Sequence, residues 1–167
     1  MMRIDVIQQL PALQVVIPLL GAVLTAFLRR GVLAWGLAAT VTWAMPVIAG
    51  ALLWQVLQGG PISYHLGGWP PPWGIEYRVD VLSAFVLLLV SAVSAVMMPF
   101  ARRSVAFEIE GDKQAWFYAM YLLCLTGLLG ITITGDAFNA FVFLEISSLS
   151  TYVLIAMGRD RRALLAA

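Results

Sequence analysis

The chain has 167 residues, of which 62% are hydrophobic and only 11% are charged. Soluble domains are roughly 45–50% apolar and about 25% charged, so a soluble core of this length cannot absorb the apolar surface of this chain. The formal net charge of +1, together with the lack of a basic tract interleaved with aromatics, argues against a nucleic-acid partner. These properties predict a single membrane domain over residues 1–167.

Five apolar runs are long enough to cross a bilayer core of roughly 30 Å as helices. Their approximate bounds are Leu10–Leu28, Val32–Leu57, Val79–Ala101, Ala115–Thr134 and Ala137–Met157. The predicted fold is therefore all-α, a polytopic bundle of about five transmembrane helices. The segment 102–114 mixes basic and acidic residues, and we interpret it as a solvated link between two helices.

Basic residues are distributed unevenly between the connecting segments. Eight fall on one side of the predicted membrane: Arg29, Arg30, Arg102, Arg103, Lys113, Arg159, Arg161 and Arg162. Only Arg3 and Arg78 fall on the other side. Since cytoplasmic loops carry the excess of Lys and Arg, this asymmetry predicts an external N-terminus and a cytoplasmic C-terminus.

The segment 58–78 is the one long external loop of this prediction, and it is rich in Gly and Pro. We expect Ile62–Leu66 and Ile75–Val79 to pair as a short hairpin around its Trp-Pro turn. The aromatic residues of the loop suit the headgroup level of a membrane, which favours interfacial anchoring over a small-molecule site; they are Tyr64, Trp69, Trp73 and Tyr77. We expect His65 to be exposed or hydrogen-bonded, since no second metal ligand stands at a useful spacing.

One carboxylate, Glu145, is the ninth residue of the fifth run and would lie near the middle of the membrane. An acidic side chain there costs roughly 2.5–3.5 kcal/mol on insertion scales, so protein, water or a partner charge must surround it. Two interpretations stay open: a reversible proton carrier, and a protonated acid that hydrogen-bonds across a helix interface. The residues that share its helix face are Phe141, Val142, Ser148 and Leu149, of which only Ser148 is polar.

Asp136 and Asp80 each stand immediately before a predicted helix or at its start. The expected role of both is an N-cap, in which the carboxylate accepts hydrogen bonds from the free amides of the first turn. An external role in ion uptake is the alternative for both. Asn139 lies in the first turn of the fifth run and could bond Asp136.

Small and hydroxyl residues of the fourth run are assigned no functional role. Gly127 and Gly130 allow close approach of a neighbouring helix. Thr126, Thr132 and Thr134 are expected to bond back to their own helix. The single cysteine, Cys124, cannot form an internal disulfide or a Cys-rich metal site.

No glycine-rich phosphate loop, nucleophile with a base, or cluster of metal ligands is recognisable in the sequence. We therefore expect no enzymatic chemistry in this polypeptide, no cofactor and no metal.

Three stretches together resemble a known family. Residues 66–85 read LGGWPPPWGIEYRVDVLSAF, residues 117–136 read FYAMYLLCLTGLLGITITGD, and residues 136–158 read DAFNAFVFLEISSLSTYVLIAMG. They are similar to the D subunit of multisubunit monovalent cation/proton antiporters (the Mrp type) and, more broadly, to the antiporter-like subunits of respiratory complex I. The likeness covers essentially the whole chain.

The resemblance implies a multi-pass subunit of a sodium/proton antiporter in the bacterial cytoplasmic (inner) membrane, with other membrane subunits as partners. Glu145 matches the family's glutamate of the fifth core helix, which belongs to a proton-conducting line. Two alternatives remain: a subunit in the membrane arm of a complex I-like or hydrogenase-linked redox pump, and a non-conducting structural membrane subunit.

Members of that family are much longer, are built from two inverted repeats, and pair the glutamate with a lysine on a later helix. The one lysine of this chain, Lys113, lies in a predicted loop. We interpret the chain as a fragment, a truncated product, or an N-terminal half whose C-terminal helices are supplied by a separate chain.

Overall fold

The computed structural model describes residues 6–28, 30–69, 73–111 and 113–158. Its five long helices are α1 (Leu10–Ala26), α2 (Gly31–Gly59), α3 (Val81–Glu108), α4 (Gln114–Ile133) and α5 (Ala137–Ala156), and a short 3₁₀ turn, η1 (Val6–Gln9), precedes α1. All five helical segments are long and apolar enough to cross a membrane. The prediction of an all-α bundle with five spans is confirmed.

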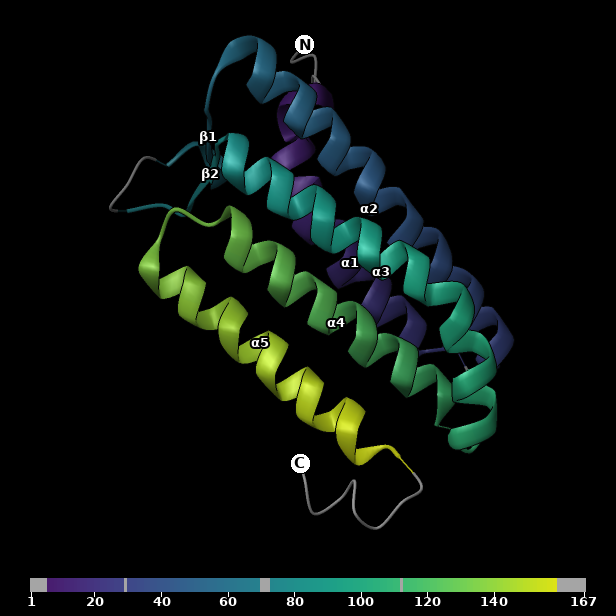
Figure 1. Ribbon diagram of the computed structural model, residues 1–167. Helices are drawn as coiled ribbons and strands as arrows, with labels where there is room; N and C mark the ends of the chain where they lie inside the picture. The colour runs from purple at the N-terminus through teal and green to yellow at the C-terminus, as the bar shows by residue number, and fades with distance from the viewer. Residues whose placement is uncertain (1–5, 29, 70–72, 112, 159–167) are drawn as a thin grey trace, which may run out of the picture.

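The helices lie side by side and run roughly along one direction (Figure 1). Helix α1 packs against α2 and α4, and α3 packs against both of the same helices. Helix α5 lies at the outer edge of the bundle, where α4 is its main neighbour (Figure 1). Most of the α5 surface is therefore not covered by the other four helices.

Two clusters of buried side chains hold the bundle together. Toward the hairpin, the cluster consists of Val15, Met45, Ala49, Leu52, Val56, Tyr77, Val79, Ala84, Leu87, Leu125, Leu129, Ile133 and Phe143. Toward the other end, it consists of Ala22, Ala34, Ala38, Val41, Met98, Val105, Ile109, Ala115, Tyr118 and Leu122. The alanines of the second cluster let helix backbones approach closely, which is the usual basis of helix association in membranes.

Helix α3 continues past the predicted end at Ala101 as far as Glu108, so the first half of the predicted link 102–114 is helical, and all of its residues except Val105 are exposed. The continuation is amphipathic: Val105 is buried in the bundle, whereas the charged residues around it are exposed. The Arg102 guanidinium also lies over the Trp35 ring, 4.6 Å from its centroid. Such cation–π contact and apolar burial stabilise a helix beyond its apolar run.

The predicted hairpin is present. Strand β1 (Ile62–His65) pairs antiparallel with β2 (Glu76–Val79), and Tyr64 stands opposite Tyr77. The hairpin is docked on the start of α5, because the Gly135 amide donates to the Glu76 carbonyl at 2.9 Å. An isolated bridge between Tyr77 and Thr134 adds to this contact.

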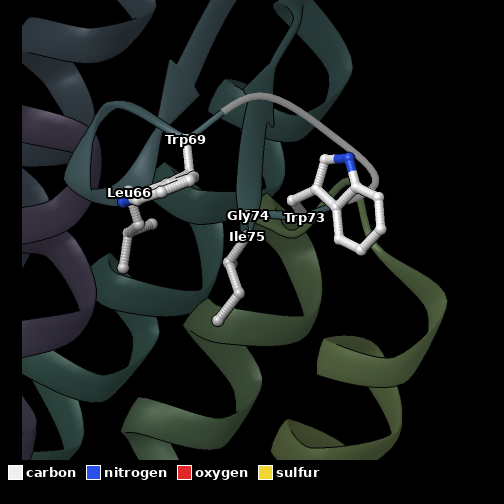
Figure 2. Close-up of a pocket in the computed structure, with 5 residues that line it drawn as sticks. All are labelled: Leu66, Trp69, Trp73, Gly74 and Ile75. Carbon is white, nitrogen blue, oxygen red and sulfur yellow. The ribbon is translucent and has the colours of Figure 1, made fainter.

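The tip of the hairpin carries two exposed indoles. Leu66, Trp69, Trp73, Gly74 and Ile75 line a shallow cavity of about 530 Å³, and Trp69 and Trp73 are 66% and 85% exposed (Figure 2). Interfacial anchoring by these two indoles stays a prediction. Tyr77 is only 5% exposed, so its side chain is not available for interfacial anchoring. Its inward position follows from strand alternation, which turns it toward α4 and α5.

Candidate functional site

Glu145 lies on the outer face of α5. The residues that α5 buries are Asn139, Phe143, Ser147 and Ser150, a stripe at helical spacing that faces α4. Glu145 follows Phe143 by two positions, which is about 200° around a helix with 3.6 residues per turn. It is exposed, as are its apolar neighbours Phe141, Leu144 and Leu149. The carboxylate therefore points away from the bundle.

Glu145 has no partner within the part of the chain that the structure describes: no side chain there forms a hydrogen bond or ion pair with it. It is the ninth residue of α5, about 12 Å from the start of the helix at 1.5 Å per residue. Ser148, the one polar residue predicted to share its helix face and so a possible support for the acid, is half-buried on the adjoining side of the helix. Any compensating group for the acid must come from outside the described residues.

The seam between α4 and α5 determines the direction in which Glu145 points. A Cβ atom added at Gly127 would lie 2.7 Å from the Ser147 backbone nitrogen, and one added at Gly130 would lie 2.4 Å from the Phe143 ring. The predicted role of these glycines in close helix approach is confirmed. Because no larger residue fits at this seam, α5 cannot roll easily on α4.

The N-terminus of α5 is capped by Asp136, as predicted. Its two carboxylate oxygens accept hydrogen bonds from the amides of Phe138 and Asn139, each at 3.2 Å. The expected bond between Asn139 and Asp136 is thus made by the Asn139 backbone. The Asn139 side chain donates instead to the Thr134 hydroxyl at 3.2 Å.

The three threonines divide into two groups. Thr126 and Thr132 donate to carbonyls one turn earlier, as predicted. Thr134 does not, because it follows the last helical residue and its hydroxyl contacts the Asp136 backbone instead. Thr134 is therefore part of the cap of α5.

Tyr77 contributes to this cap region, and sequence reasoning did not identify it. Burial raises the pKa of the Tyr77 hydroxyl, and a hydrogen bond with the Asn139 side chain partly offsets that rise. The residue comes from β2, far from α5 in the chain. The alternation of β2 was the only local signal that Tyr77 faces inward.

Asp80 caps α3, as predicted, and its Oδ1 accepts the Ser83 amide at 2.7 Å. Hydrogen bonds from Ser83 hold the pKa of this carboxyl below its ordinary value. Asp80 and Asp136 thus serve two different helix ends, and Glu145 lies deep along α5. The structure does not gather the predicted site residues into one cluster.

His65 is hydrogen-bonded and partly exposed, as expected. It faces Glu76 across the hairpin, with Nε2 and Oε1 3.9 Å apart, and Ser63 contacts both side chains. Among the described residues, no three His, Cys, Asp or Glu side chains come together in a way that could hold a metal.

Similarity to known proteins extends over nearly the whole chain. It is 40% identical over 161 residues to the N subunit of NADH-quinone oxidoreductase from Desulforudis audaxviator, covering 95% of this chain and 32% of that protein. It is 31% identical over 147 residues to the D subunit of the Na⁺/H⁺ antiporter from Bacillus subtilis, covering 87% of this chain and 29% of that protein. No protein-family model matches the chain.

Two solved structures share the fold. The archaeal membrane-bound sulfane sulfur reductase, a respiratory membrane complex, contains a chain with a TM-score of 0.83 and 31% identity, covering 95% of this chain and 32% of that one. The Mrp complex from Dietzia sp. contains a chain with a TM-score of 0.83 and 27% identity, covering 98% of this chain and 30% of that one.

The chain spans about a third of the length of the curated relatives that it matches, which fits the expected N-terminal portion of a longer subunit. The relatives are membrane subunits of multisubunit complexes, and the five apolar helices described above agree with that assignment. Over nearly its whole length the chain is similar to antiporter-like membrane subunits, which include the D subunit of Mrp-type Na⁺/H⁺ antiporters and the N subunit of NADH-quinone oxidoreductase.

Proposed function

We propose that this chain is part of a multisubunit monovalent cation/proton antiporter in the bacterial cytoplasmic membrane, and that Glu145 is a reversible proton carrier in it. The observation that carries the proposal is the position of Glu145: an acid far along a membrane-spanning helix, on the face opposite α4, among exposed apolar side chains. Lipid is a poor environment for an acid. This face of α5 is therefore an interface with further helices.

The chemistry of the proposed step is proton uptake and release at the Glu145 carboxyl. The protonated form is neutral and suits an apolar surrounding, whereas the ionised form needs a nearby cation or water. We expect a lysine on a helix outside this chain's described part to supply that cation. Movement of the proton on and off Glu145 would then be coupled to the approach of the lysine.

The proposed orientation follows the asymmetry of the basic residues. The hairpin and the N-terminus of α5 lie at the external side, and Arg102 and Lys113 lie at the cytoplasmic side. Asp136, at the external end of α5, acts mainly as the cap of that helix. Five of the arginines on which the orientation depends lie outside the described residues: Arg3, Arg29, Arg159, Arg161 and Arg162.

A second candidate function is a subunit in the membrane arm of a redox-driven proton pump. The similarity to the N subunit of NADH-quinone oxidoreductase favours it. Genomic neighbourhood separates the two functions: genes for small membrane antiporter subunits indicate the first, and genes for hydrogenase or quinone-reductase subunits indicate the second.

The test of the proton-carrier role is substitution of Glu145 in the complete assembly. Glu145→Gln keeps the size and the hydrogen-bonding capacity but removes the titrating proton, so assembly should survive while transport is largely lost. Glu145→Asp keeps the acid but shortens its reach by about 1.5 Å, one bond length of chain, so partial activity with an altered pH optimum is expected. Transport is measured in inverted vesicles as cation-driven dequenching of a pH-sensitive dye.

Asp136→Asn is the matched control, because it also replaces an acid of the α5 region by its amide. Asparagine caps a helix about as well as aspartate, so this variant should transport almost normally. Assembly of the complex is checked in parallel for every variant. Normal transport by an assembled Glu145→Gln complex would make Glu145 a structural residue and refute the proposal.

A further inference from the structure

An amide side chain is buried inside the bundle with one end unsatisfied. Gln14 of α1 has no exposed surface, and its Nε2 donates to the Met45 carbonyl of α2 at 3.5 Å. Its Oε1 has no hydrogen-bond partner among the described residues. Reversing the amide would place two oxygens against each other at Met45, so the unsatisfied atom is an acceptor. A buried acceptor without a donor is costly enough to indicate a missing partner.

Prolines leave further acceptors on the same two helices. Pro18 has no N–H, so it cannot bond the carbonyl of Gln14 four residues earlier, and Pro46 likewise leaves the carbonyl of Thr42 without its helical donor. The Thr42 hydroxyl is already used, because it donates to the Ala38 carbonyl at 2.6 Å. No described side chain outside α1 and α2 donates to these carbonyls.

Pro99 of α3 provides a contrast within the same bundle. The carbonyl that it leaves free belongs to Ala95, and the Trp43 indole donates to that carbonyl at 3.0 Å. The proline of α3 is therefore compensated by a protein donor. The prolines of α1 and α2 have no corresponding donor among the described side chains.

These acceptors lie along one stretch of the contact between α1 and α2. Gln14 touches Met45 at one end of the stretch, and a Cβ atom added at Gly21 would lie 2.9 Å from the Val41 side chain at the other. Pro18 and Thr42 fall between these two contacts in the sequences of their helices. A small hydrogen-bond donor that contacts both α1 and α2 would satisfy acceptors in this position.

The lack of charged residues on α1 and α2 indicates which class of hydrogen-bond donor fits these acceptors. Neither α1 nor α2 contains an Asp, Glu, Lys or Arg residue, so no charge is available there to balance a cation. A neutral molecule with two O–H donors matches the excess of acceptors. Water has this chemistry, and buried waters in proteins typically bridge such unsatisfied groups.

A cavity open to the outside of the bundle comes within one helical turn of Gln14. Pro11, one helical turn before it, lines a cavity of about 550 Å³ at the hairpin end of the bundle. Amide and hydroxyl side chains line the same cavity; they include Gln8, Gln9, Gln55, Ser63 and Tyr64. The cavity is open, and its largely apolar wall carries these polar groups.

We propose that Gln14 Oε1 binds a water molecule between α1 and α2, where the two proline-interrupted helices leave acceptors without donors. The water donates to Oε1 and to a free carbonyl, and so joins α1 to α2 by a bond that the protein alone does not make. The site lies on α1, within the bundle, whereas Glu145 lies on the outer face of α5. It is thus independent of the proposed proton carrier.

The test is X-ray radiolytic footprinting of the full chain in its membranes, with oxidation read by mass spectrometry. Hydroxyl radicals formed from a bound water oxidise the side chains beside it, and a methionine thioether is converted to the sulfoxide. Met45 and Met98 both have no exposed surface, and the backbone carbonyl of Met45 accepts a hydrogen bond from Gln14. In H₂¹⁸O, labelled sulfoxide is expected at Met45 and not at Met98.

Two variants test whether the labelling of Met45 depends on the side-chain amide of Gln14. Gln14→Leu keeps a side chain of similar size without an acceptor, so Met45 labelling should be lost. Gln58→Leu removes the same functional group at an exposed site in α2 that does not line the cavity, and Met45 labelling should persist. Helix content by circular dichroism checks that both variants fold.

Equal labelling of Met45 and Met98, or labelling of Met45 that persists in a folded Gln14→Leu variant, would overturn the proposal. Loss of Met45 labelling in sodium but not in potassium would also overturn it, because a bound ion would then occupy the site. None of these outcomes depends on transport activity, so the result is separate from the test of Glu145.

Discussion

Gly127→Ala is expected to push α5 away from α4 and to destabilise the fold. The added Cβ atom would lie 2.7 Å from the Ser147 nitrogen and Cβ, and 2.8 Å from the Phe143 carbonyl oxygen. Carbon atoms pack best at about 3.5–4.0 Å, so the two helices must separate by roughly 1 Å. Two of the three close atoms belong to the backbone of α5, so no change of rotamer relieves the clash.

The expected loss in free energy of unfolding is about 1–3 kcal/mol, the usual cost of adding a methyl group to a well-packed interface. Alanine also favours a helix over glycine by up to about 1 kcal/mol, which would hide part of that loss. Gly50→Ala in α2 is the matched control, since nothing lies within 4 Å of its added Cβ atom. The difference between the two variants isolates the cost of the clash.

The measurement is SDS titration of the purified chain in detergent micelles, followed by far-UV circular dichroism. Gly130→Ala adds a graded comparison, because the three atoms nearest its added Cβ all belong to the Phe143 ring, and a side chain can turn where backbone cannot. Its loss should be smaller than that of Gly127→Ala. If Gly127→Ala is as stable as Gly50→Ala, the close approach of α4 and α5 does not hold the helix that carries Glu145, and the reasoning fails.

Two further predictions concern orientation and pH. Reporter fusions after Lys113 and Arg162 should read cytoplasmic and a fusion near Trp69 external, because the basic residues gather on one side; an external reading at Arg162 would contradict the five-span topology. Hydrogen bonds from Ser83 lower the pKa of Asp80 from 3.8, so its capping contribution is complete above that value and is lost as the pH falls below it. Thermal scans from pH 6 down to about pH 3 should show a smaller acid-induced loss in Asp80→Asn than in the parent chain, and equal losses would refute the capping argument.

Local chemistry made several features predictable from the sequence alone. Apolar runs of bilayer length determine the existence and the approximate bounds of the five helices. Asp80 and Asp136 cap α3 and α5, since a short acid before an apolar run reaches its own first-turn amides. The hairpin and the close approach at Gly127 likewise follow from residue types within a few positions of each other.

Features that depend on a segment distant in the chain could not be predicted from the local sequence. The run of charges after Ala101 conceals a continued helix, because its stability depends on Trp35 of α2. Tyr77 and Thr134 come into contact only after β2 docks on the start of α5. The sequence of neither segment indicates that the other is its partner. Gln14 is ordinary in sequence, and its unsatisfied oxygen exists only because α2 packs over it.

Glu145 shows most clearly which properties the sequence determines and which the tertiary structure determines. Its position in the sequence determines that it is an acid far along a membrane-spanning helix, since depth depends only on the count of residues from the helix end. The direction in which it points is a tertiary property. Which face of α5 is buried was decided by Gly127 and Gly130 of α4, whose missing side chains admit Ser147 and Phe143 and thereby turn Glu145 outward.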